Sequence, residues 1–359
     1  MGNLPTQLTV GSVITSSSAS YRIGRSIGSG GFGQTYLALD MRSHGFVAVK
    51  EYFPKRCTPQ RLPDATVRPT GSMASMYYEG MKSFLKEATM LAALRDIDSI
   101  VHVTDYFEAY GTAYMVMDYV IGETLRDCII NRGPMAYAMI EKPMLALMRD
   151  VDTINGAGVV HRDINPANVI LTPGGRLRLI DFGCARSMED GRSMEVMLTP
   201  GFAPTEQYSR HGQGPFTDVY ALCATLYYCL TGEVPPSSSD RANAVYQGAP
   251  DPLALPSQLG VSLPDGVEDV LMRGLSIFSQ HRTQTMGRLA DELEEARRPR
   301  PVVPQPRPEP KPEPTAPEPQ EEEHESWLRR WGVTVLVAIA VVAGIAFVAS
   351  ATMCSMGAG

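Results

Sequence analysis

The segment His161–Ile170 reads HRDINPANVI, and it decides how the rest of the chain is interpreted. It follows a predicted helix that ends near Gly158, and it is followed by the strand-like stretch RLRLIDFG. Asp163 is placed to accept a proton from a hydroxyl group, and Asn168, five residues later, offers an amide oxygen to a metal ion. Asp181, at the end of the strand-like stretch, adds a carboxylate suited to Mg²⁺. Together these residues predict a site for phosphate chemistry.

A cluster of glycines lies in YRIGRSIGSGGFGQTYLALD, Tyr21–Asp40. Gly28, Gly30 and Gly33 form the pattern G-x-G-x-x-G, and apolar and polar residues alternate on both sides of it. This alternation predicts a hairpin of two strands, whose glycine backbone can approach phosphate oxygens closely. A Rossmann dinucleotide fold would follow its glycines with a helix, whereas TYLALD continues as a strand. The hairpin is therefore the favoured interpretation.

The next predicted strand, FVAVKEYF, has Lys50 at its centre. A lone lysine in a strand usually faces solvent, but here the helical stretch FLKEATMLAAL follows, with an apolar stripe and Glu87 at its edge. Glu87 can reach back to Lys50 and form an ion pair that holds the ammonium group on nucleotide phosphates. We predict that this ion pair is the conformational gate of the site.

The ordered set G-x-G-x-x-G, V-A-V-K, H-R-D with its later asparagine, and D-F-G resembles the eukaryotic-type protein kinase family. The resemblance covers about residues 21–297. The segment VKEYFP and an insert at 54–81 resemble the corresponding parts of bacterial membrane-anchored serine/threonine protein kinases. The resemblance implies an α+β, bilobal fold, with a small antiparallel β lobe that carries one helix and a larger, mainly α-helical lobe.

Composition and resemblance together divide the chain into a lead-in, a kinase domain, a linker, a membrane helix and a tail. The expected boundaries are 1–20 for the lead-in, 21–298 for the kinase domain (N-lobe about 21–117, hinge 118–122, C-lobe about 123–298), 299–326 for the Pro-rich and acidic linker, 332–354 for the transmembrane helix and 355–359 for the tail.

The resemblance also implies roles for individual residues. ATP would contact Ile27, Gly28, Ser29, Gly30, Gly31, Phe32, Gly33, Thr35, Lys50, the gatekeeper Met117, and the hinge residues Asp118 and Val120. Asp163 would be the catalytic base, supported by Lys50, Glu87 and Asn165, and the metal ligands would be Asn168 and Asp181. Regulatory or structural roles fall to Arg162, Thr199, Glu206, Asp218 and Arg282, with Glu206 paired to Arg282 and Asp218 bracing the catalytic loop from below.

Two positions depart from the family pattern. Thr205 stands where proline is usual in the substrate-docking segment, Leu198–Tyr208, which predicts a looser turn. Asn165 stands where serine/threonine kinases carry a lysine that touches the transferring phosphate. Losing such a cation costs about 2–4 kcal/mol of transition-state stabilisation, which slows the reaction without abolishing it. We therefore expect an active enzyme.

Two alternatives to a serine/threonine protein kinase stay open. Asn165 is also compatible with a pseudokinase, an ATP-binding scaffold with little or no turnover. A small-molecule phosphotransferase of related fold is less favoured, because Arg162 and the docking segment are features of enzymes that align a peptide. A nucleic-acid binder is excluded by the net charge of −7.

The expected cofactors and partners follow from the kinase interpretation. They are ATP with Mg²⁺, or Mn²⁺ in its place, protein substrates that carry Ser or Thr, and a second copy of the chain as a homodimer for autophosphorylation. Ser187, Ser193 and Thr199 are candidate phosphorylation sites, where a phosphate could pair with Arg162. The six cysteines are widely spaced and are expected to be free thiols in a reducing compartment.

The C-terminal part of the chain predicts a membrane anchor. Ten prolines between Pro299 and Pro319 favour an extended spacer, and an acidic run follows. No charged residue follows Gly332, and the apolar stretch approaches the ~20 residues of a bilayer-spanning helix. Arg329 and Arg330 precede this stretch, so the kinase domain is expected on the cytoplasmic side of the cell membrane and the C-terminal end across it.

Overall fold

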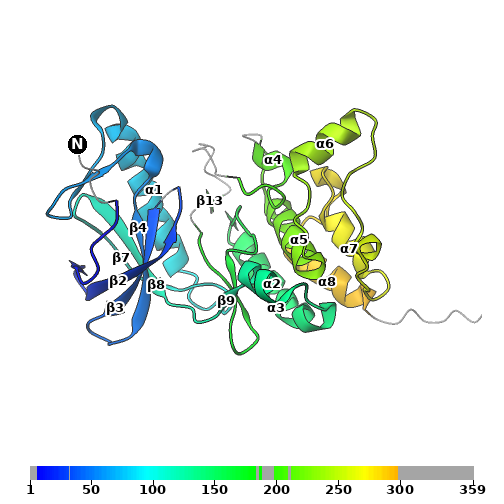
Figure 1. Ribbon diagram of the computed structural model, residues 1–359, viewed down its shortest axis with the longest axis horizontal. Helices are drawn as coiled ribbons and strands as arrows, with labels where there is room; N and C mark the ends of the chain where they lie inside the picture. Colours follow the sequence, from blue (N-terminus) through cyan, green and yellow to red (C-terminus); the bar gives the residue numbers. More distant parts are fainter. Residues whose placement is uncertain (1–5, 32, 183–185, 188–197, 209–211, 298–359) are drawn as a thin grey trace, which may run out of the picture. The chain divides into compact units, whose positions relative to one another are not determined.

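The computed structural model describes residues 6–31, 33–182, 186–187, 198–208 and 212–297, and for 186–187 it describes the backbone alone. All of these residues fall within the unit Met1–Arg300. A small β-rich lobe and a larger helical lobe are joined by the segment that follows strand β8 (Thr112–Asp118), as Figure 1 shows. The two-lobed α+β architecture expected from the sequence is confirmed.

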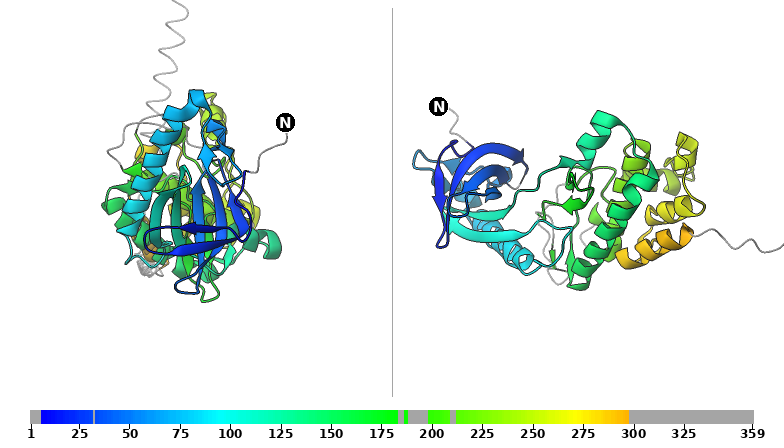
Figure 2. Two further views of the ribbon diagram at one scale, coloured as in Figure 1. Left: turned by 90° about the vertical axis from the view of Figure 1, so that its left-hand side faces the viewer. Right: turned by 90° about the horizontal axis from the view of Figure 1, so that it is seen from below.

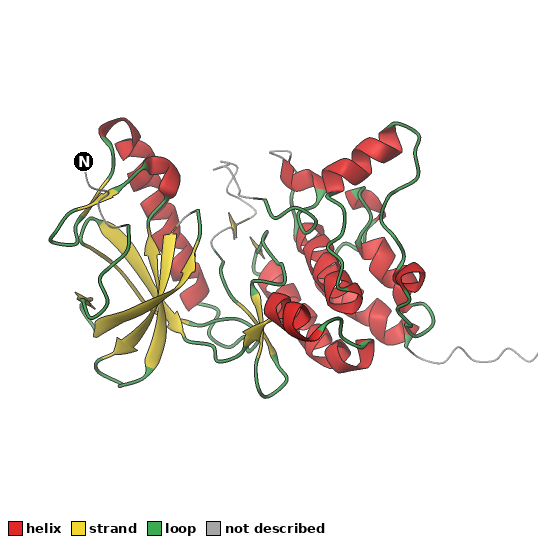
Figure 3. Ribbon diagram, in the orientation of Figure 1, coloured by secondary structure: helices red, strands yellow, loops and turns green. Residues whose placement is uncertain are grey.

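An antiparallel sheet with the strand order β1-β2-β3-β4-β8-β7 forms the small lobe (Figure 3). Besides β8, its strands are β1 (Val13–Thr15), β2 (Ser20–Ser29), β3 (Gly33–Asp40), β4 (Phe46–Tyr52) and β7 (Val103–Ala109). β2 and β3 form the predicted hairpin, in which Tyr21 lies opposite Asp40 and Ser29 lies opposite Gln34 beside the turn. The glycine-rich turn therefore lies at the end of the sheet where β4 carries Lys50, which pairs with Thr35 across the strands.

Both faces of this sheet carry buried side chains. Successive side chains of a strand point to opposite faces, so neighbouring residues belong to different clusters. Met115 and Met117 of β8 belong to the main core, whereas Tyr114 and Val116 belong to a second cluster on the outer face. The N-terminal segment closes that outer cluster with Leu8, whose backbone N–H donates to the Tyr36 hydroxyl at 3.0 Å. Residues 6–20, expected as a lead-in, thus contribute to the small lobe.

The insert at 54–81 has structure of its own. It contains η1 (Lys55–Cys57), the hairpin of β5 (Gln60–Arg61) and β6 (Val67–Arg68), and η2 (Gly71–Met73). Helix α1 (Ala74–Ala92) begins inside the insert, well before the predicted helical stretch. The rings of Tyr77 and Phe84 on α1 lie 5.2 and 5.7 Å from that of Tyr52 on β4. Tyr77, in the second half of the insert, therefore belongs to the main core, although most residues around it are exposed.

Helices and short strands build the larger lobe (Figure 2). The helices are α2 (Leu125–Arg132), α3 (Tyr137–Gly156), α4 (Thr205–Tyr208), α5 (Pro215–Thr231), α6 (Ser238–Tyr246), α7 (Val267–Gly274) and α8 (Met286–Ala296), with 3-10 turns η3 (Pro256–Leu259) and η4 (Ser279–His281). The strands are β9 (Glu123–Thr124), β10 (Val159–Val160), β11 (Val169–Leu171), β12 (Leu177–Leu179) and β13 (Arg186–Ser187).

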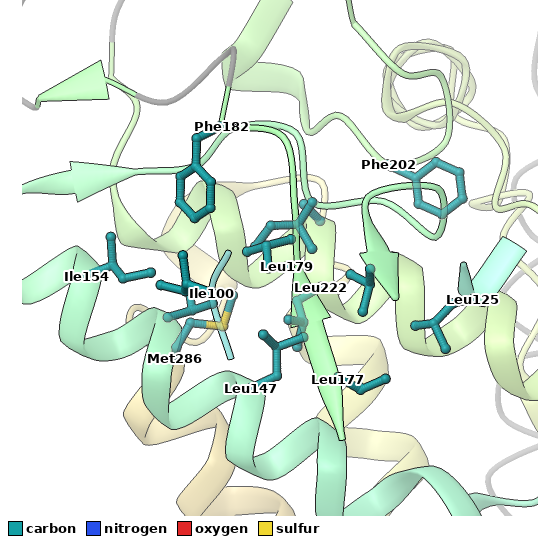
Figure 4. Close-up of a cluster of buried hydrophobic side chains, with 14 of the residues drawn as sticks. Ile100, Leu125, Leu147, Ile154, Leu177, Leu179, Phe182, Phe202, Leu222 and Met286 are labelled. Carbon is teal, nitrogen blue, oxygen red and sulfur yellow. The ribbon is translucent and has the colours of Figure 1, made fainter. Parts of the chain in front are cut away.

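The core of the larger lobe lies between its helices and the strands that carry the site. Figure 4 shows Leu147 and Ile154 of α3, Leu222 of α5 and Met286 of α8 together with Leu177 and Leu179 of β12. Nearly every residue of α5 is buried, which is why its sequence is apolar around its whole circumference. This central helix provides a rigid base for the loop that precedes β11.

The predicted transmembrane helix at 332–354 and the linker at 299–326 lie outside the described residues. Among the helices that the structure describes, none combines the length and apolarity needed to span a bilayer.

Candidate active site

Asp163 lies on the loop between β10 and β11, and its carboxylate accepts three side-chain hydrogen bonds. Asn165 Nδ2 and Thr199 Oγ1 each donate to Oδ1 at 2.8 Å, and Asn168 Nδ2 donates to Oδ2 at 2.8 Å. Burial raises the pKa of Asp163 to about 6, although these three donors favour the charged form. A carboxylate held from three sides, with a pKa near neutrality, has the orientation and basicity that suit a general base.

Asp218 of α5 holds this loop from beneath. Its carboxylate accepts hydrogen bonds from the backbone N–H groups of His161 and Arg162 and from Asn155 Nδ2, each at 2.9 Å. Arg162 has a φ of +68°, in the left-handed region that non-glycine residues rarely adopt. Asp218 therefore stabilises a strained turn directly before Asp163.

The pairing of β11 with β12 brings Asn168 close to Asp181. Val169 lies opposite Leu179, and the backbone carbonyl of Asn168 accepts a hydrogen bond from Ile180 N at 2.8 Å. Phe182 packs edge-on against the His161 ring, with centroids 4.4 Å apart. The strand pair and this ring contact fix Asp181 beside the catalytic loop, and its side chain stays half exposed.

These two residues fit the chemistry of a hard divalent cation. Asn168 directs its amide nitrogen to Asp163, so its amide oxygen remains for a ligand, and Asp181 offers a carboxylate. Mg²⁺ is commonly bound by one or two protein oxygens together with substrate phosphates and water. Among the described residues, no group of three or more His, Cys, Asp or Glu residues forms a self-sufficient metal site. The donor set thus suits a metal that arrives with a nucleotide.

The predicted gating pair differs in the structure. Lys50 Nζ lies 2.7 Å from Asp181 Oδ1, whereas no ion pair joins Lys50 to Glu87 in the described part of the chain. Glu87 Oε1 is buried and accepts no hydrogen bond from the described residues. Burial raises the pKa of Glu87 to about 8, which the attraction of Lys50 offsets only in part. Burial disfavours the charged form of the Glu87 carboxyl, whereas Asp181 stays half exposed, and the ammonium group lies against Asp181.

The glycine-rich turn is shaped by contacts with β4 and the insert. A Cβ atom on Gly33 would lie 2.0 Å from the carbonyl oxygen of Glu51, so this position requires glycine. Lys55 N, in the insert, donates to Gly31 O at 3.1 Å. Ile27, Gly28, Ser29 and Gly30 are exposed, Thr35 is half-buried, and Phe32 lies outside the described residues. An exposed loop backbone beside Lys50 is open to a phosphate chain.

The predicted hinge follows β8. Met117 is buried, and Asp118 donates its backbone N–H to His102 O at 3.0 Å. The Asp118 side chain turns towards the ring of His102, with Nδ1 and Oδ2 3.2 Å apart. Val120 is half-buried against the main core. The predicted gatekeeper and hinge residues therefore lie together where the chain passes between the lobes.

The docking segment is anchored through Glu206 and Thr205 of α4. Glu206 Oε1 lies 2.6 Å from Arg282 NH1, and both side chains are buried. Thr205 Oγ1 donates to Ile277 O at 2.9 Å, so the threonine adds a tie that proline could not make. This hydrogen bond opposes the looser turn expected from the missing proline.

Sequence reasoning placed Thr199 as a partner of Arg162 after phosphorylation, but in the structure its hydroxyl contacts Asp163. Ser193 lies outside the described residues, and only the backbone of Ser187 is described. Gln207 was missed. Its Nε2 donates to Arg162 O at 2.7 Å, and its only sequence signal is its place beside Glu206.

Comparisons with known proteins agree with this geometry. Residues 21–263 match the family model for the protein kinase domain. The chain is 30% identical over 281 residues to serine/threonine-protein kinase PknB of Mycobacterium leprae. The match covers 76% of this chain and 42% of that protein. It is 31% identical over 283 residues to PknB of Mycolicibacterium smegmatis, with coverage of 76% and 42%.

The chain thus spans about two fifths of the length of these curated relatives. A solved structure, "PpkA-294 apo form", matches with a TM-score of 0.67 and 29% sequence identity, and the match covers 80% of this chain and 100% of the other. The expected similarity to bacterial serine/threonine kinases is confirmed. Because the family model covers most of the described residues and its motifs converge on one site, the chain belongs to the protein kinase family.

Proposed function

We propose that the chain is an ATP-dependent protein kinase that transfers the γ-phosphate of ATP to Ser or Thr hydroxyls of proteins and also phosphorylates itself. The observation that carries this proposal is the convergence of Asp163, Asn168 and Asp181. Asn168 contacts the Asp163 carboxylate at 2.8 Å with its side chain, while its backbone is joined to the strand that ends at Asp181. A proton acceptor and two oxygen ligands at one place are what phosphoryl transfer requires.

Each group has a distinct chemical task in this proposal. Asp163 would orient the substrate hydroxyl and accept its proton as the oxygen attacks the γ-phosphorus. Lys50, whose ammonium lies 2.7 Å from Asp181, would hold the nucleotide phosphates beneath the glycine-rich turn. Mg²⁺ or Mn²⁺, held by Asn168 and Asp181, would supply positive charge to the phosphates.

The position of Asn165 bears on whether the chain catalyses phosphoryl transfer or only binds ATP. Asn165 is 5% exposed, and its side chain donates to both the backbone carbonyl and the carboxylate of Asp163. It therefore orients the base, although it supplies no positive charge to the phosphate. This arrangement supports an active enzyme over an ATP-binding scaffold.

The choice of Ser or Thr as acceptor is supported by the relatives. The Thr199 hydroxyl donates to Asp163 Oδ1 at 2.8 Å and so joins the docking segment to the proposed base. The curated relatives carry the name serine/threonine-protein kinase.

Labelled ATP with the purified full chain tests this proposal. In the presence of Mg²⁺ the chain should label itself and a generic protein substrate, and acid hydrolysis should recover phosphoserine or phosphothreonine. The Asp163→Asn variant should bind ATP but transfer no label. ATP binding without transfer by the unaltered chain would favour the scaffold, and phosphotyrosine as the product would refute the acceptor class. Transfer from the active chain to a tagged Asp163→Asn chain would show that one copy phosphorylates another.

We also propose that residues 332–354 anchor the chain as a single-pass membrane protein, with the kinase domain on the cytoplasmic side. The uncharged apolar stretch and the preceding Arg329 and Arg330 support this orientation. The full chain should sediment with membranes and resist carbonate extraction, and a chain that ends at Ser326 should be released. Equal sedimentation of the two chains would contradict the anchor.

A further inference from the structure

The peptide unit that joins Arg162 to Asp163 is held at both ends. Its carbonyl oxygen, on Arg162, accepts a hydrogen bond from Gln207 Nε2 at 2.7 Å. Its N–H, on Asp163, donates to His161 Nδ1 at 3.2 Å. The peptide plane is therefore fixed on one side by the docking segment and on the other by the ring that packs against Phe182.

This peptide follows a residue with an unfavourable backbone conformation. Arg162 has a φ of +68°, and without outside contacts an L-residue would leave this region readily. Asp218 Oδ1 accepts the Arg162 N–H at 2.9 Å, so Asp218 holds one side of the strained residue and Gln207 holds the other. A backbone held in a rare conformation persists only where its surroundings determine it.

Gln207 is buried and held in place, so its side chain can fix the position of this turn. It is 7% exposed and lies on α4, which the ion pair of Glu206 with Arg282 anchors at 2.6 Å. The identity of the donating atom follows from the chemistry, since a carbonyl oxygen can only accept and the amide nitrogen is the only donor of a glutamine side chain. Gln207 Oε1 is buried and accepts no hydrogen bond from the described residues. A buried side-chain amide whose nitrogen donates but whose oxygen has no partner lowers the stability of the fold. Its presence here therefore indicates a role at the site.

We propose that Gln207 is a positioning residue: it fixes the Arg162–Asp163 peptide and thereby aims the Asp163 carboxylate at the substrate hydroxyl. It rests on the proposed kinase activity and deepens it. Because Gln207 adjoins Glu206, it links the segment that docks a protein substrate to the base that deprotonates it. Asp163 is thus oriented by side chains on its carboxylate and by Gln207 through its backbone.

The test replaces Gln207 with methionine, which keeps the length of the side chain and removes the donor. Misplacement of a reacting group by about 1 Å can cost on the order of 100-fold in rate, so kcat for a protein substrate should fall by about 10- to 100-fold. KM for ATP should stay within about twofold, because the predicted nucleotide contacts come from the small lobe and the hinge and none of them changes. The thermal midpoint should stay close to that of the unaltered chain.

Gln284→Met is the matched control. Gln284 Nε2 also donates to an arginine backbone carbonyl, that of Arg282, at 2.6 Å, but it lies on the exposed surface away from Asp163. This variant should keep kcat. A second readout is independent of activity: hydrogen exchange at the Asp163 amide should be faster in Gln207→Met than in the unaltered chain and unchanged in Gln284→Met.

The outcomes separate the inference from the proposed function. An unaltered chain without any phosphoryl transfer would refute the proposed function, and the exchange rate at Asp163 would still report on the backbone role of Gln207. An active unaltered chain with equal kcat in Gln207→Met would overturn the inference, as would a loss of kcat matched in Gln284→Met. Should Gln207→Met fail to fold, Gln207→Asn, whose amide falls one methylene short of Arg162 O, is measured against the same expectations.

Discussion

The guanidinium of Arg61 lies 2.6 Å from the carboxylate of Glu51, and the two side chains are 3% and 0% exposed. The hydroxyls of Tyr36 and Tyr114 donate to the same carboxylate at 3.0 Å each. Arg61 comes from the insert and also donates to Thr6 O in the N-terminal segment at 3.4 Å. One buried cation therefore joins the N-terminal segment and the insert to β4, at the residue next to Lys50.

Arg61→Met should destabilise the small lobe. Removing one partner of a buried ion pair leaves an uncompensated charge and costs about 3–5 kcal/mol of unfolding free energy. Denaturant unfolding should show this loss, and Arg68→Met, at an exposed position of the same hairpin, should change stability by no more than about 0.5 kcal/mol. The double variant Arg61→Met with Glu51→Met should recover part of the loss, and a double variant as unstable as the sum of the single ones would contradict the pairing.

Glu87 should make stability depend on pH. Its pKa is raised from 4.5 to about 8 in the folded chain, so the folded state binds the proton more tightly than the unfolded state does. The stabilisation from the protonated form is fully present below about pH 4.5 and is lost as the pH rises towards 8. Unfolding free energies of the unaltered chain and of Glu87→Gln, measured across this window, should therefore diverge, with the unaltered chain losing stability relative to the variant. Parallel curves would show that Glu87 does not titrate in this way.

Asn165→Ala should lower kcat. The variant loses the donor that lies 2.8 Å from Asp163 Oδ1, and hydrogen bonds to charged groups contribute about 1.5–3 kcal/mol, which corresponds to roughly a 10- to 100-fold decrease. Steady-state kinetics with a protein substrate would measure this decrease. Asn131→Ala removes a donor to Glu123 on the surface, at 2.7 Å, and should leave kcat unchanged. An unaffected Asn165→Ala enzyme would show that this asparagine does not orient the base.

Thr199 should tolerate serine better than valine. Serine keeps the hydroxyl that donates to Asp163 Oδ1 at 2.8 Å, whereas valine keeps the shape and removes the donor. Thr199→Val should therefore lose about tenfold or more in kcat, and Thr199→Ser should stay near the unaltered enzyme. Equal losses in both variants would indicate that the methyl group matters and the hydrogen bond does not.

The sequence could predict those parts of the site whose order along the chain is characteristic. The glycine hairpin, the strand of Lys50 and the loop around Asp163 have short-range patterns, and the structure has them where the patterns indicate. Glu206 and Arg282 are 76 residues apart, and only the resemblance to a family suggested that they meet.

Contacts that depend on which residues are buried in the folded chain could not be predicted in this way. Lys50 lies against Asp181 rather than Glu87, and the burial of Glu87, which disfavours its charged form, cannot be seen in the sequence. The start of α1 at Ala74 was missed, although the buried side of the helix recurs at helical spacing from Tyr77 through Met81 to Phe84. The role of the insert that carries Arg61 was left open, since nothing in its neighbouring residues shows that Arg61 and its partner Glu51 are buried.

The cover that Leu8 and Thr6 place over the outer face of the sheet sets where this domain can be cut. The family match starts at residue 21, yet a chain trimmed to that boundary would expose Tyr36 and the other apolar residues of the outer cluster to water. Such a fragment should aggregate on purification, while one that begins before Thr6 should remain monodisperse in size-exclusion chromatography. The stable domain of this chain thus begins before the first residue of the family match.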